Sequence, residues 1–349
     1  MLAERSKCDY IFGPFKQHKL IIYMIPEEKK SAVANALNVA FGTSEIEDIR
    51  QLTAGLSTAL IFRIVVKGKA YLLRVITRTD AMADPTHYYS CMEPAAEAGL
   101  APKVWYAGIE DRISITDFIE PNPFPIELAR IKMPSLLKDL HALPPFPHTV
   151  KYIDFVDGIV QKFRESKILP ERMTEDLFDQ YARISKIYPR TGPDMVACHN
   201  DLKPENIIYD GERPWLVDWE AAFLNDRYSD LSIVKNFVVK NDDEEKEFLR
   251  NYFGTEPTDY QLARLFLMQQ VVNMAYFVFF LNITAKTPVD LDFNRWDFRG
   301  FHDGIWSGKI TLETDEIRQQ YGLIHMEQLR HNFQLKRFEE SLKIVTDHK

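Results

Sequence analysis

The segment that most constrains this chain is residues 198–209, which read CHNDLKPENIIY. It holds a histidine, an aspartate, a lysine and an asparagine, and apolar residues stand on both sides of it, at 195–197 and 207–209. A loop held between two short strands can keep polar groups rigid. We therefore expect a polar site in the middle of the chain, carried by such a loop.

A second acidic segment follows closely, WLVDWE at residues 215–220. Asp218 is expected to follow a short apolar strand, so that Asp201, Asn206 and Asp218 meet at one end of a small hairpin. Mg²⁺ prefers hard oxygen ligands such as carboxylates and amide oxygens. Phosphoryl transfer also needs a carboxylate that orients the attacking hydroxyl and accepts its proton. The pattern thus predicts Asn206 and Asp218 as magnesium ligands and Asp201 as the base.

The first third of the chain has the pattern of a small antiparallel sheet with helices. Apolar runs separated by turn residues, such as Gly68, predict strands. Pro26 begins one helical pattern and Gly42 stands just past its end. The expected strands are 45–52, 59–66, 70–76, 103–109 and 113–119, and the expected helices are 26–41 and 85–98.

A composition break at residues 120–125, EPNPFP, marks the expected domain boundary. Three prolines in six residues make a stiff, extended connector. The predicted domains are therefore 1–119 and 120–349, a sheet-rich lobe and a helical lobe with one hairpin insertion around 195–223. The fold class is α+β. Helices are expected at about 126–141, 150–166, 172–188, 242–253, 257–283 and 313–345.

Composition excludes several kinds of partner and site. A net charge of −8 argues against a nucleic-acid partner. The three cysteines form no CxxC pair, which argues against a disulfide framework or a zinc site and fits a reducing cytoplasm. The longest apolar segment, 262–281, is interrupted by an arginine, two glutamines and an asparagine. It is expected to be a buried helix rather than a membrane span.

The central motif resembles a known one. HNDLKPEN is similar to the catalytic loop of the protein-kinase superfamily, HxDxxxxN, and VDWE stands where those enzymes carry Asp-Phe-Gly. The Asn200 in second position and the Asp-Trp-Glu resemble the aminoglycoside phosphotransferase and choline kinase families, most of all the choline/ethanolamine kinase branch. Residues 221–232, AAFLNDRYSDLS, are similar to the choline kinase segment after the metal-binding Asp. The resemblance implies a two-lobed protein-kinase-like fold.

The resemblance also implies roles for residues of the central loop. Asp201 matches the catalytic base, and Asn206 and Asp218 match the Mg²⁺ ligands. His199 matches a histidine that usually supports the loop through hydrogen bonds. Lys203 is a candidate to contact the transferring phosphate, because an ammonium stabilises spreading charge. Asp230 is expected to brace the loop, and Glu220 is a candidate to position metal or substrate.

The small lobe is expected to bind ATP. The glycine in TAGLST, residues 53–58, lets backbone N–H groups approach phosphate, and two hydroxyls add donors. Arg74 is expected to bind phosphate, with a surface arginine as the alternative. The positions where the family carries its partner glutamate hold His87, Tyr88 and Tyr89, with Asp84 and Glu93 as the nearest acids. The expected nucleotide-binding residues are Gly55, Leu56, Ser57, Thr58, Arg74, Phe118 and Ile119.

The acceptor is expected to meet the helical segment 271–282, VVNMAYFVFFLN. Tyr276 and Phe280 share one helix face. Aromatic faces hold a quaternary ammonium with about 0.5–2 kcal/mol per ring, and the alternative is a core stripe. Aminoglycoside kinases favour acidic pockets instead, but the DDEE run at 242–245 is expected to be a solvated helix start.

These observations predict an ATP- and Mg²⁺-dependent phosphotransferase acting on a hydroxyl of a small molecule, with choline or a related amino alcohol as the leading acceptor. An aminoglycoside or another metabolite is the second choice, and a non-catalytic nucleotide-binding pseudokinase is the rival from another class. We expect a cytoplasmic monomer or homodimer with neither a nucleic-acid nor a membrane partner. The choice between ATP and GTP stays open.

Overall fold

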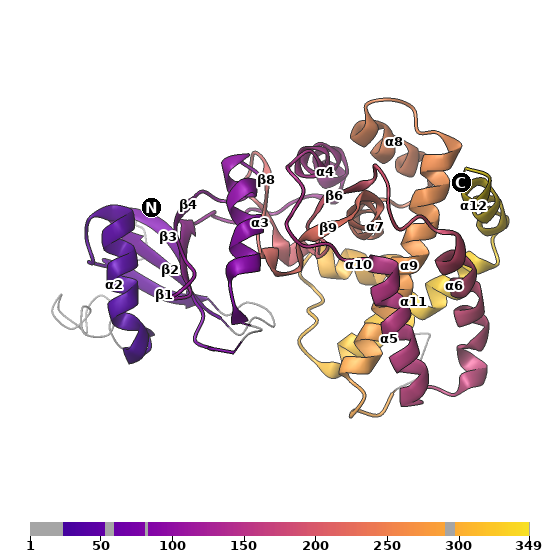
Figure 1. The fold of residues 1–349 in the computed structure, drawn as a ribbon, viewed down its shortest axis with the longest axis horizontal. Coiled ribbons are helices and arrows are strands. Elements are labelled where there is room, and N and C mark those ends of the chain that lie inside the picture. The colour runs from indigo at the N-terminus through magenta and orange to yellow at the C-terminus, as the bar shows by residue number, and fades with distance from the viewer. Residues whose placement is uncertain (1–23, 53–58, 81–82, 290–296, 349) are drawn as a thin grey trace, which may run out of the picture. The chain divides into compact units, whose positions relative to one another are not determined.

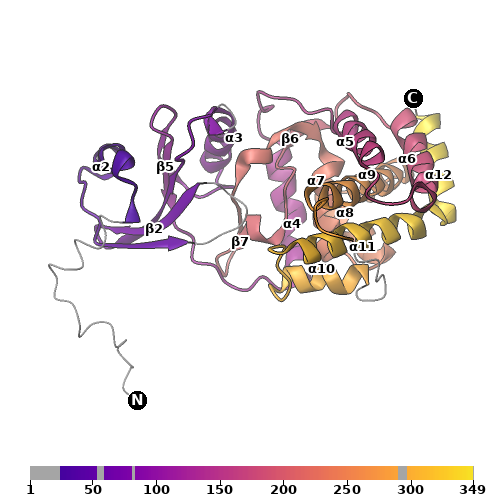
Figure 2. The ribbon, with the colours of Figure 1, turned by 90° about the horizontal axis from the view of Figure 1, so that it is seen from below.

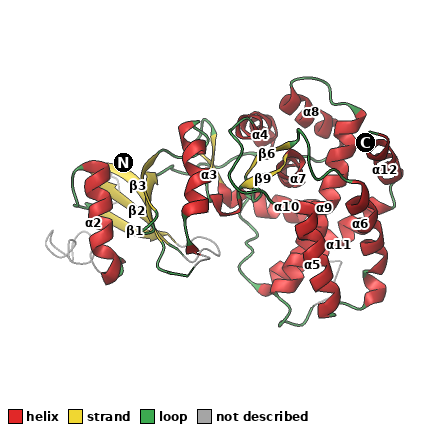
Figure 3. Ribbon diagram, in the orientation of Figure 1, coloured by secondary structure: helices red, strands yellow, loops and turns green. Residues whose placement is uncertain are grey.

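The computed structural model of the protein describes residues 24–52, 59–80, 83–289 and 297–348. The chain divides into two compact units, residues 1–120 and 121–349 (Figure 1). The first unit combines a sheet with two helices, and helices dominate the second (Figure 3). The predicted α+β class is therefore confirmed.

A five-stranded antiparallel sheet forms the first unit, in the order β1-β2-β3-β5-β4. All five predicted strands are present, but β5 lies beside β3 and leaves β4 at the edge. Lys67 and Gly68 connect β2 to β3 with φ of 50° and 73°, the two positive values that a tight hairpin turn requires. The strands are β1 (Asp48–Leu52), β2 (Leu60–Val66), β3 (Lys69–Val75), β4 (Val104–Gly108) and β5 (Ile113–Asp117).

Two helices accompany this sheet, α2 (Glu27–Phe41) and α3 (Thr86–Glu97). Helix α2 begins after Pro26 and ends at Gly42, whose φ is 69°, the left-handed conformation that favours glycine at a helix end. Apolar side chains of α2 and the inner face of the sheet form one core, including Val33, Leu37, Phe62, Ile64, Leu73 and Ile115.

The second unit is built around α9 (Asp259–Ile283), which is buried on nearly all sides. It packs against several helices, and Figure 2 shows α11 running beside it. By length and composition alone α9 could cross a membrane, but 72% of its most apolar window is buried inside the protein. The predicted buried helix is confirmed. The others are α4 (Ile126–His141), α5 (Tyr152–Ser166), α6 (Glu175–Ile187), α7 (Arg227–Val238), α8 (Asp242–Phe253), α10 (Phe298–Trp306), α11 (Asp315–Phe333) and α12 (Lys336–Asp347).

The predicted single helix at 313–345 is wrong, because the chain breaks between α11 and α12. Leu335 is extended, with φ −73° and ψ 139°. The break lets Phe338 pack on Phe333, with ring centroids 4.8 Å apart, and lets α12 pack on α9. No proline or glycine stands at this position, so tertiary packing rather than a local signal ends the helix.

The predicted single hairpin insertion is also incomplete. Two small sheets are present: β6 (Met195–Cys198) pairs with β9 (Phe223–Asp226), and β7 (Ile207–Tyr209) pairs with β8 (Pro214–Leu216). The polar run of residues 199–206 connects β6 to β7, and it is called the catalytic loop below because it carries the predicted base, Asp201. Because β6 and β9 are far apart in sequence, no local turn signal points to their pairing.

Candidate active site

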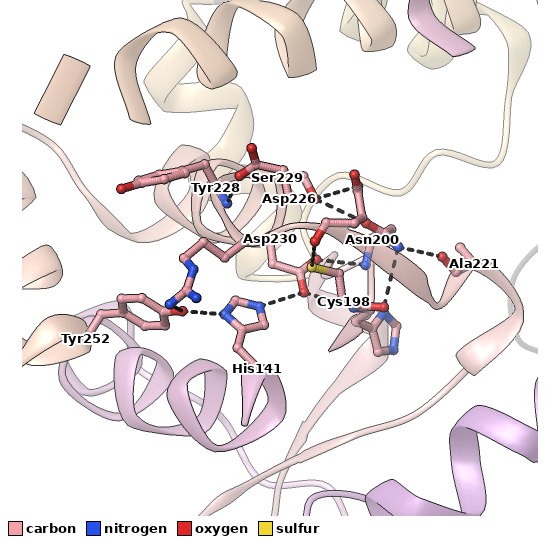
Figure 4. A network of polar contacts seen from close by, with 12 residues as sticks. His141, Cys198, Asn200, Ala221, Asp226, Tyr228, Ser229, Asp230 and Tyr252 are labelled. Carbon is pink, nitrogen blue, oxygen red and sulfur yellow. Dashed lines mark hydrogen bonds and ion pairs between the residues drawn. The ribbon is translucent and has the colours of Figure 1, made fainter. Parts of the chain in front are cut away.

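The catalytic loop leaves β6 through a left-handed turn at Asn200, whose φ is 63°. Asparagine tolerates this conformation better than most residues. Its amide nitrogen donates to the Ala221 oxygen at 3.0 Å, and its amide oxygen accepts from Asn225 at 2.7 Å and Ser229 at 3.1 Å (Figure 4). An asparagine rather than an arginine thus forms the turn and ties it to β9 and α7.

Asp230, in the first turn of α7, holds the backbone of the loop. Its carboxylate is fully buried and accepts the backbone N–H of His199 at 2.8 Å and that of Asn200 at 2.7 Å. These two residues immediately precede Asp201. The expectation that Asp230 braces the loop is therefore confirmed.

The side chain of His199 supports the loop from the protein interior. Its side chain is buried, and Nε2 lies 2.9 Å from the Val217 carbonyl oxygen. Because a carbonyl only accepts, Nε2 donates. The ring also contacts Trp219, with centroids 4.9 Å apart. His199 thereby links the catalytic loop to the segment that carries Asp218.

Asp201, Lys203 and Asn206 form the polar centre of the loop. Lys203 Nζ and Asn206 Nδ2 each donate to Asp201 Oδ2 at 2.8 Å. Burial lowers the pKa of Lys203, but the neighbouring carboxylates of Asp201, Asp218 and Glu205 outweigh it and raise that pKa above its ordinary value. The side chain of Asp201 is 33% exposed, so its carboxylate remains open to an incoming group.

Asn206 and Asp218 lie at the same end of the β7–β8 hairpin. The backbone N–H of Val217 donates to the backbone carbonyl oxygen of Asn206 at 3.0 Å, and Asp218 takes a left-handed φ of 65° directly after it. Asp201 holds the amide nitrogen of Asn206, which leaves its amide oxygen for a cation. Carboxylate and amide oxygens are the donors that Mg²⁺ prefers, so these residues fit a magnesium ion. Glu220 is exposed on the short 3₁₀ turn Trp219–Ala221.

The predicted acceptor residues Tyr276 and Phe280 belong to an aromatic cluster with Tyr321 and His325 of α11. Ring centroids are 5.9 Å apart for Tyr276 and Phe280, and 5.0 Å for Phe280 and Tyr321. Tyr276 and Phe280 are partly exposed, whereas Phe277 beside them is fully buried. The pair thus lies at the border of the core rather than wholly within it.

The hydroxyls of this cluster lie within electrostatic reach of the catalytic loop. Burial raises the pKa of Tyr276 well above its ordinary value, and Tyr321, Asp201 and Tyr152 add to the rise. The pKa of Tyr321 is raised by burial and then by Glu205 and Asp201. Sequence reasoning missed Tyr152 and Tyr321, because they lie on helices far from residues 271–282. The Tyr321–His325 spacing of four was the one available signal.

Only part of the predicted nucleotide site falls in described residues. Gly55, Leu56, Ser57 and Thr58 lie outside them. Arg74 of β3 is buried, with its guanidinium carbon 4.8 Å from the centre of the Tyr88 ring of α3. Phe118 lies under the Arg63 guanidinium at 5.4 Å, just after β5. Ile119 follows it and is half-buried.

The acidic run at 242–245 is not wholly a solvated helix start, so that expectation is wrong for one residue. Asn241 caps α8 by accepting the N–H of Glu244 at 3.0 Å. Glu245 is only 2% exposed and pairs with Lys235 at 2.5 Å. A buried carboxylate requires such a partner, and the lysine comes from α7.

An open hollow of about 450 Å³ lies between α5 and α6, but none of its lining residues belongs to the catalytic loop. Its one carboxylate, Asp157, is bound by Tyr181 at 2.8 Å, Ser185 at 3.0 Å and Arg190 at 3.1 Å. These hydrogen bonds give the carboxylate a structural role, so we do not place the acceptor there.

Comparison with known proteins identifies the class. The model of the phosphotransferase enzyme family matches residues 48–266, more than half of the chain. The chain therefore belongs to this family, and the predicted family and enzyme class are confirmed.

Individual relatives show what the chain is similar to. A LicA homolog of Mycoplasma capricolum is 27% identical over 161 residues, which cover 46% of this chain and 63% of that protein. A choline/ethanolamine kinase family protein from Mesorhizobium loti has a similar fold, with a TM-score of 0.66 and 20% identity over 92% of this chain and 99% of that one. The enzyme in the streptomycin–ATP–APH(2")-IIa ternary complex also has a similar fold, with a TM-score of 0.54 and 16% sequence identity. The match covers 72% of this chain and 90% of that one. These folds confirm the kinase-like architecture.

Proposed function

We propose that this protein transfers the γ-phosphoryl group of ATP to a hydroxyl of a small amino alcohol of the choline or ethanolamine type. The observation that carries the proposal is the convergence of Asp201, Asn206 and Asp218 around the ammonium of Lys203. A carboxylate beside two oxygen ligands and a cation is the set that phosphoryl transfer requires.

Asp201 acts as the base in this proposal. Its Oδ2 is held by Lys203 and Asn206, each at 2.8 Å, so the carboxylate is fixed when the acceptor hydroxyl arrives. The hydroxyl donates its hydrogen to Asp201, and its oxygen attacks the γ-phosphorus opposite the leaving oxygen. Lys203 then stabilises the charge that spreads over the transferring group.

Asn206 and Asp218 hold the magnesium ion in this proposal, and that ion would neutralise charge on the ATP phosphates. Residues 1–119 are proposed as the nucleotide lobe, with Arg74 as its phosphate contact and the backbone at 117–119 reading adenine. The ATP in the ternary complex of APH(2")-IIa supports nucleotide use within this fold.

The aromatic cluster carries the choice of acceptor. A cationic nitrogen over an aromatic face gains about 0.5–2 kcal/mol, and Tyr276 and Phe280 offer two partly exposed faces beside Tyr321. The choline/ethanolamine kinase family name of the Mesorhizobium protein supports this acceptor class. Residues 120–349 are accordingly proposed as the acceptor lobe of a cytoplasmic enzyme.

An aminoglycoside is the second candidate, supported by the streptomycin complex among the similar folds. Such acceptors carry several ammonium groups and need several free carboxylates. Within the acidic run at 242–245, Glu245 is paired with Lys235, and Glu205 and Glu220 are exposed in or near the loop. The amino alcohol is preferred because of the aromatic cluster.

The test measures ADP release with Mg²⁺–ATP over choline, ethanolamine, aminoglycosides and sugars, with Asp201→Asn as the paired variant. Turnover stimulated by an amino alcohol and lost in the variant supports the proposal. Stimulation by aminoglycosides alone would assign the second candidate. ATP binding without turnover for any acceptor would favour the pseudokinase.

A further inference from the structure

Asp230 also belongs to a row of hydrogen-bonded side chains outside the catalytic loop, which continues through three more residues. His141 of α4 places Nε2 3.2 Å from Asp230 Oδ2, and its Nδ1 lies 2.7 Å from the hydroxyl of Tyr252 in α8. Arg227 donates from Nη1 to the same hydroxyl at 3.2 Å. Figure 4 shows Tyr252 and Asp230 on opposite sides of the imidazole of His141.

The chemistry of the groups fixes the direction of every hydrogen bond in the row. A carboxylate only accepts, so His141 donates from Nε2 to Asp230. Burial lowers the pKa of His141 despite the opposing effect of Asp230, so the ring is neutral near pH 7 and its Nδ1 carries a lone pair. Tyr252 must then donate to Nδ1. Its oxygen in turn accepts from Arg227, whose guanidinium only donates.

The same cluster offers three potential metal ligands, but hydrogen bonds already account for them. Ligand atoms of His141, Cys198 and Asp230 lie within 4.8 Å of one another. Both imidazole nitrogens are occupied, however, and the Cys198 thiol donates to the Asn225 oxygen at 3.4 Å. A cation could bind here only if these hydrogen bonds were broken. We therefore assign the row of side chains a role in positioning the catalytic loop.

We propose that Tyr252 is a positioning residue for the catalytic loop. Its hydroxyl, with Arg227 behind it, holds His141 in the Nε2–H tautomer. Asp230 then keeps both oxygens directed at the backbone N–H groups of His199 and Asn200. The next residue is Asp201, so the hydroxyl of Tyr252 acts through three contacts on the alignment of the proposed base. This inference rests on the proposed role of Asp201.

A neutral imidazole can carry its hydrogen on either nitrogen. Without a donor at Nδ1, the Nδ1–H form is no longer excluded, and in that form a lone pair would face Asp230. Phe at 252 keeps the ring contact with His141, whose centroid lies 5.5 Å away, and removes only the hydroxyl. The change therefore isolates the hydrogen bond from the packing.

The experiment compares Tyr252→Phe with Tyr181→Phe. Tyr181 is also buried, and its hydroxyl also has a polar partner, Asp157 at 2.8 Å, but this pair lines the α5–α6 hollow. Nitrogen-15 NMR of the imidazoles reports the tautomer of His141. Hydrogen exchange reports the protection of the N–H groups of His199 and Asn200. Steady-state kinetics separate kcat from the KM of both substrates.

We expect a pure Nε2–H tautomer of His141 in the wild type and a mixture in Tyr252→Phe. Exchange at the two loop amides rises by about fivefold or more, and kcat falls by about tenfold at nearly unchanged KM. Tyr181→Phe changes none of these. Should Tyr252→Phe fail to fold, Arg227→Met keeps the hydroxyl, removes the N–H behind it and is expected to change the same readouts less.

A wild-type His141 that carries its hydrogen on Nδ1 would overturn the inference. So would equal loosening of the loop amides in Tyr181→Phe, or a changed tautomer with unchanged kcat. Full activity in Asp201→Asn would instead refute the proposed base. The tautomer and exchange results would still decide whether Tyr252 orders the loop, since neither depends on turnover.

Discussion

At the scale of the residue, the proposed chemistry depends on how firmly Asp201 is held. Three hydrogen bonds from two side chains hold it: Asn206 and Lys203 donate to Oδ2, and Asn206 Nδ2 also lies 2.8 Å from the Asp201 carbonyl oxygen. The carboxylate is still one third exposed. It is therefore both oriented and reachable, as a general base must be.

Replacing Asp201 by asparagine removes the base while keeping the shape of the side chain. We expect kcat to fall by about 10²–10⁴-fold, with little change in ATP affinity, because no nucleotide contact is assigned to this residue. Steady-state kinetics and ATP titration measure the two effects. The matched control is Asp157→Asn, another aspartate of the helical unit, and a comparable loss of kcat there would contradict the assignment.

Replacing Asp218 by asparagine weakens the proposed magnesium site without removing its oxygen. One negative charge is lost, so we expect the Mg²⁺ concentration needed for half-maximal rate to rise by about tenfold or more. A magnesium titration at saturating ATP tests this. Glu212→Gln removes an exposed charge from the turn of the same hairpin, and an equal shift in that variant would point to general electrostatics instead.

Spacing along the chain could predict the residues of the loop but not the residues that hold it. Asp201, Asn206 and Asp218 lie within 18 positions of one another, and a loop followed by a hairpin brings them together. Asp230, His141 and Tyr252 lie on three different helices. Their meeting depends on how α4, α7 and α8 pack, which no local pattern records.

At the scale of the element, turn chemistry decides where strands reverse. The turn between β2 and β3 has positive φ at both Lys67 and Gly68. A side chain at Gly68 would meet no atom within 4 Å, so only its φ of 73° opposes substitution. The glycine between two apolar runs is visible in the sequence, and it predicts this hairpin.

The exchange Gly68→Ala is expected to lower the free energy of unfolding by about 1 kcal/mol, the cost of a left-handed backbone for an ordinary residue. Gly158→Ala provides the matched control, since Gly158 also has open space around it but lies inside α5. There we expect a gain of about 0.5–1 kcal/mol. Urea unfolding measures both, and equal signs would contradict the backbone argument.

Helix ends show the same contrast between local and tertiary causes. Thr258 and Gln261 form a reciprocal capping box that begins α9, a signal that lies entirely in the sequence. The break between α11 and α12 has no such signal and follows from packing on α9. The expected start of α9 accordingly agrees with the structure, whereas the expected continuous helix at 313–345 fails at residue 335.

Removing this cap tests its contribution. Thr258→Ala should lower the free energy of unfolding by about 1 kcal/mol, because the N–H of Gln261 loses its acceptor at 3.2 Å. Thr258→Ser keeps the hydroxyl and should retain most of that stability. Thermal unfolding of both variants decides the point, and an equally stable Thr258→Ala would show that packing alone holds the start of α9.

At the scale of the whole molecule, buried neutral histidines contribute to the way stability responds to acid. Burial lowers the pKa of His302 to about 3, although its hydrogen bond to the Phe298 carbonyl opposes the shift. Burial also lowers the pKa of His325 and of His141. In the unfolded chain each histidine titrates near 6.5. Between that value and the folded pKa, the unfolded state binds more protons.

The stability that these histidines contribute is therefore complete above about pH 6.5 and is lost as the pH falls, since their protonation favours the unfolded state. For His302, the loss between pH 7 and pH 5 amounts to about 2 kcal/mol.

His302→Phe removes that titration, so the unfolding free energy of the variant should depend less on pH over this range, whatever its absolute stability. Urea unfolding at pH 7 and pH 5, followed by far-ultraviolet circular dichroism, measures the difference. His331→Gln, which replaces an exposed histidine of α11, is the matched control. An undiminished pH dependence in His302→Phe would mean that other groups, and not this imidazole, take up the protons when the protein unfolds in acid.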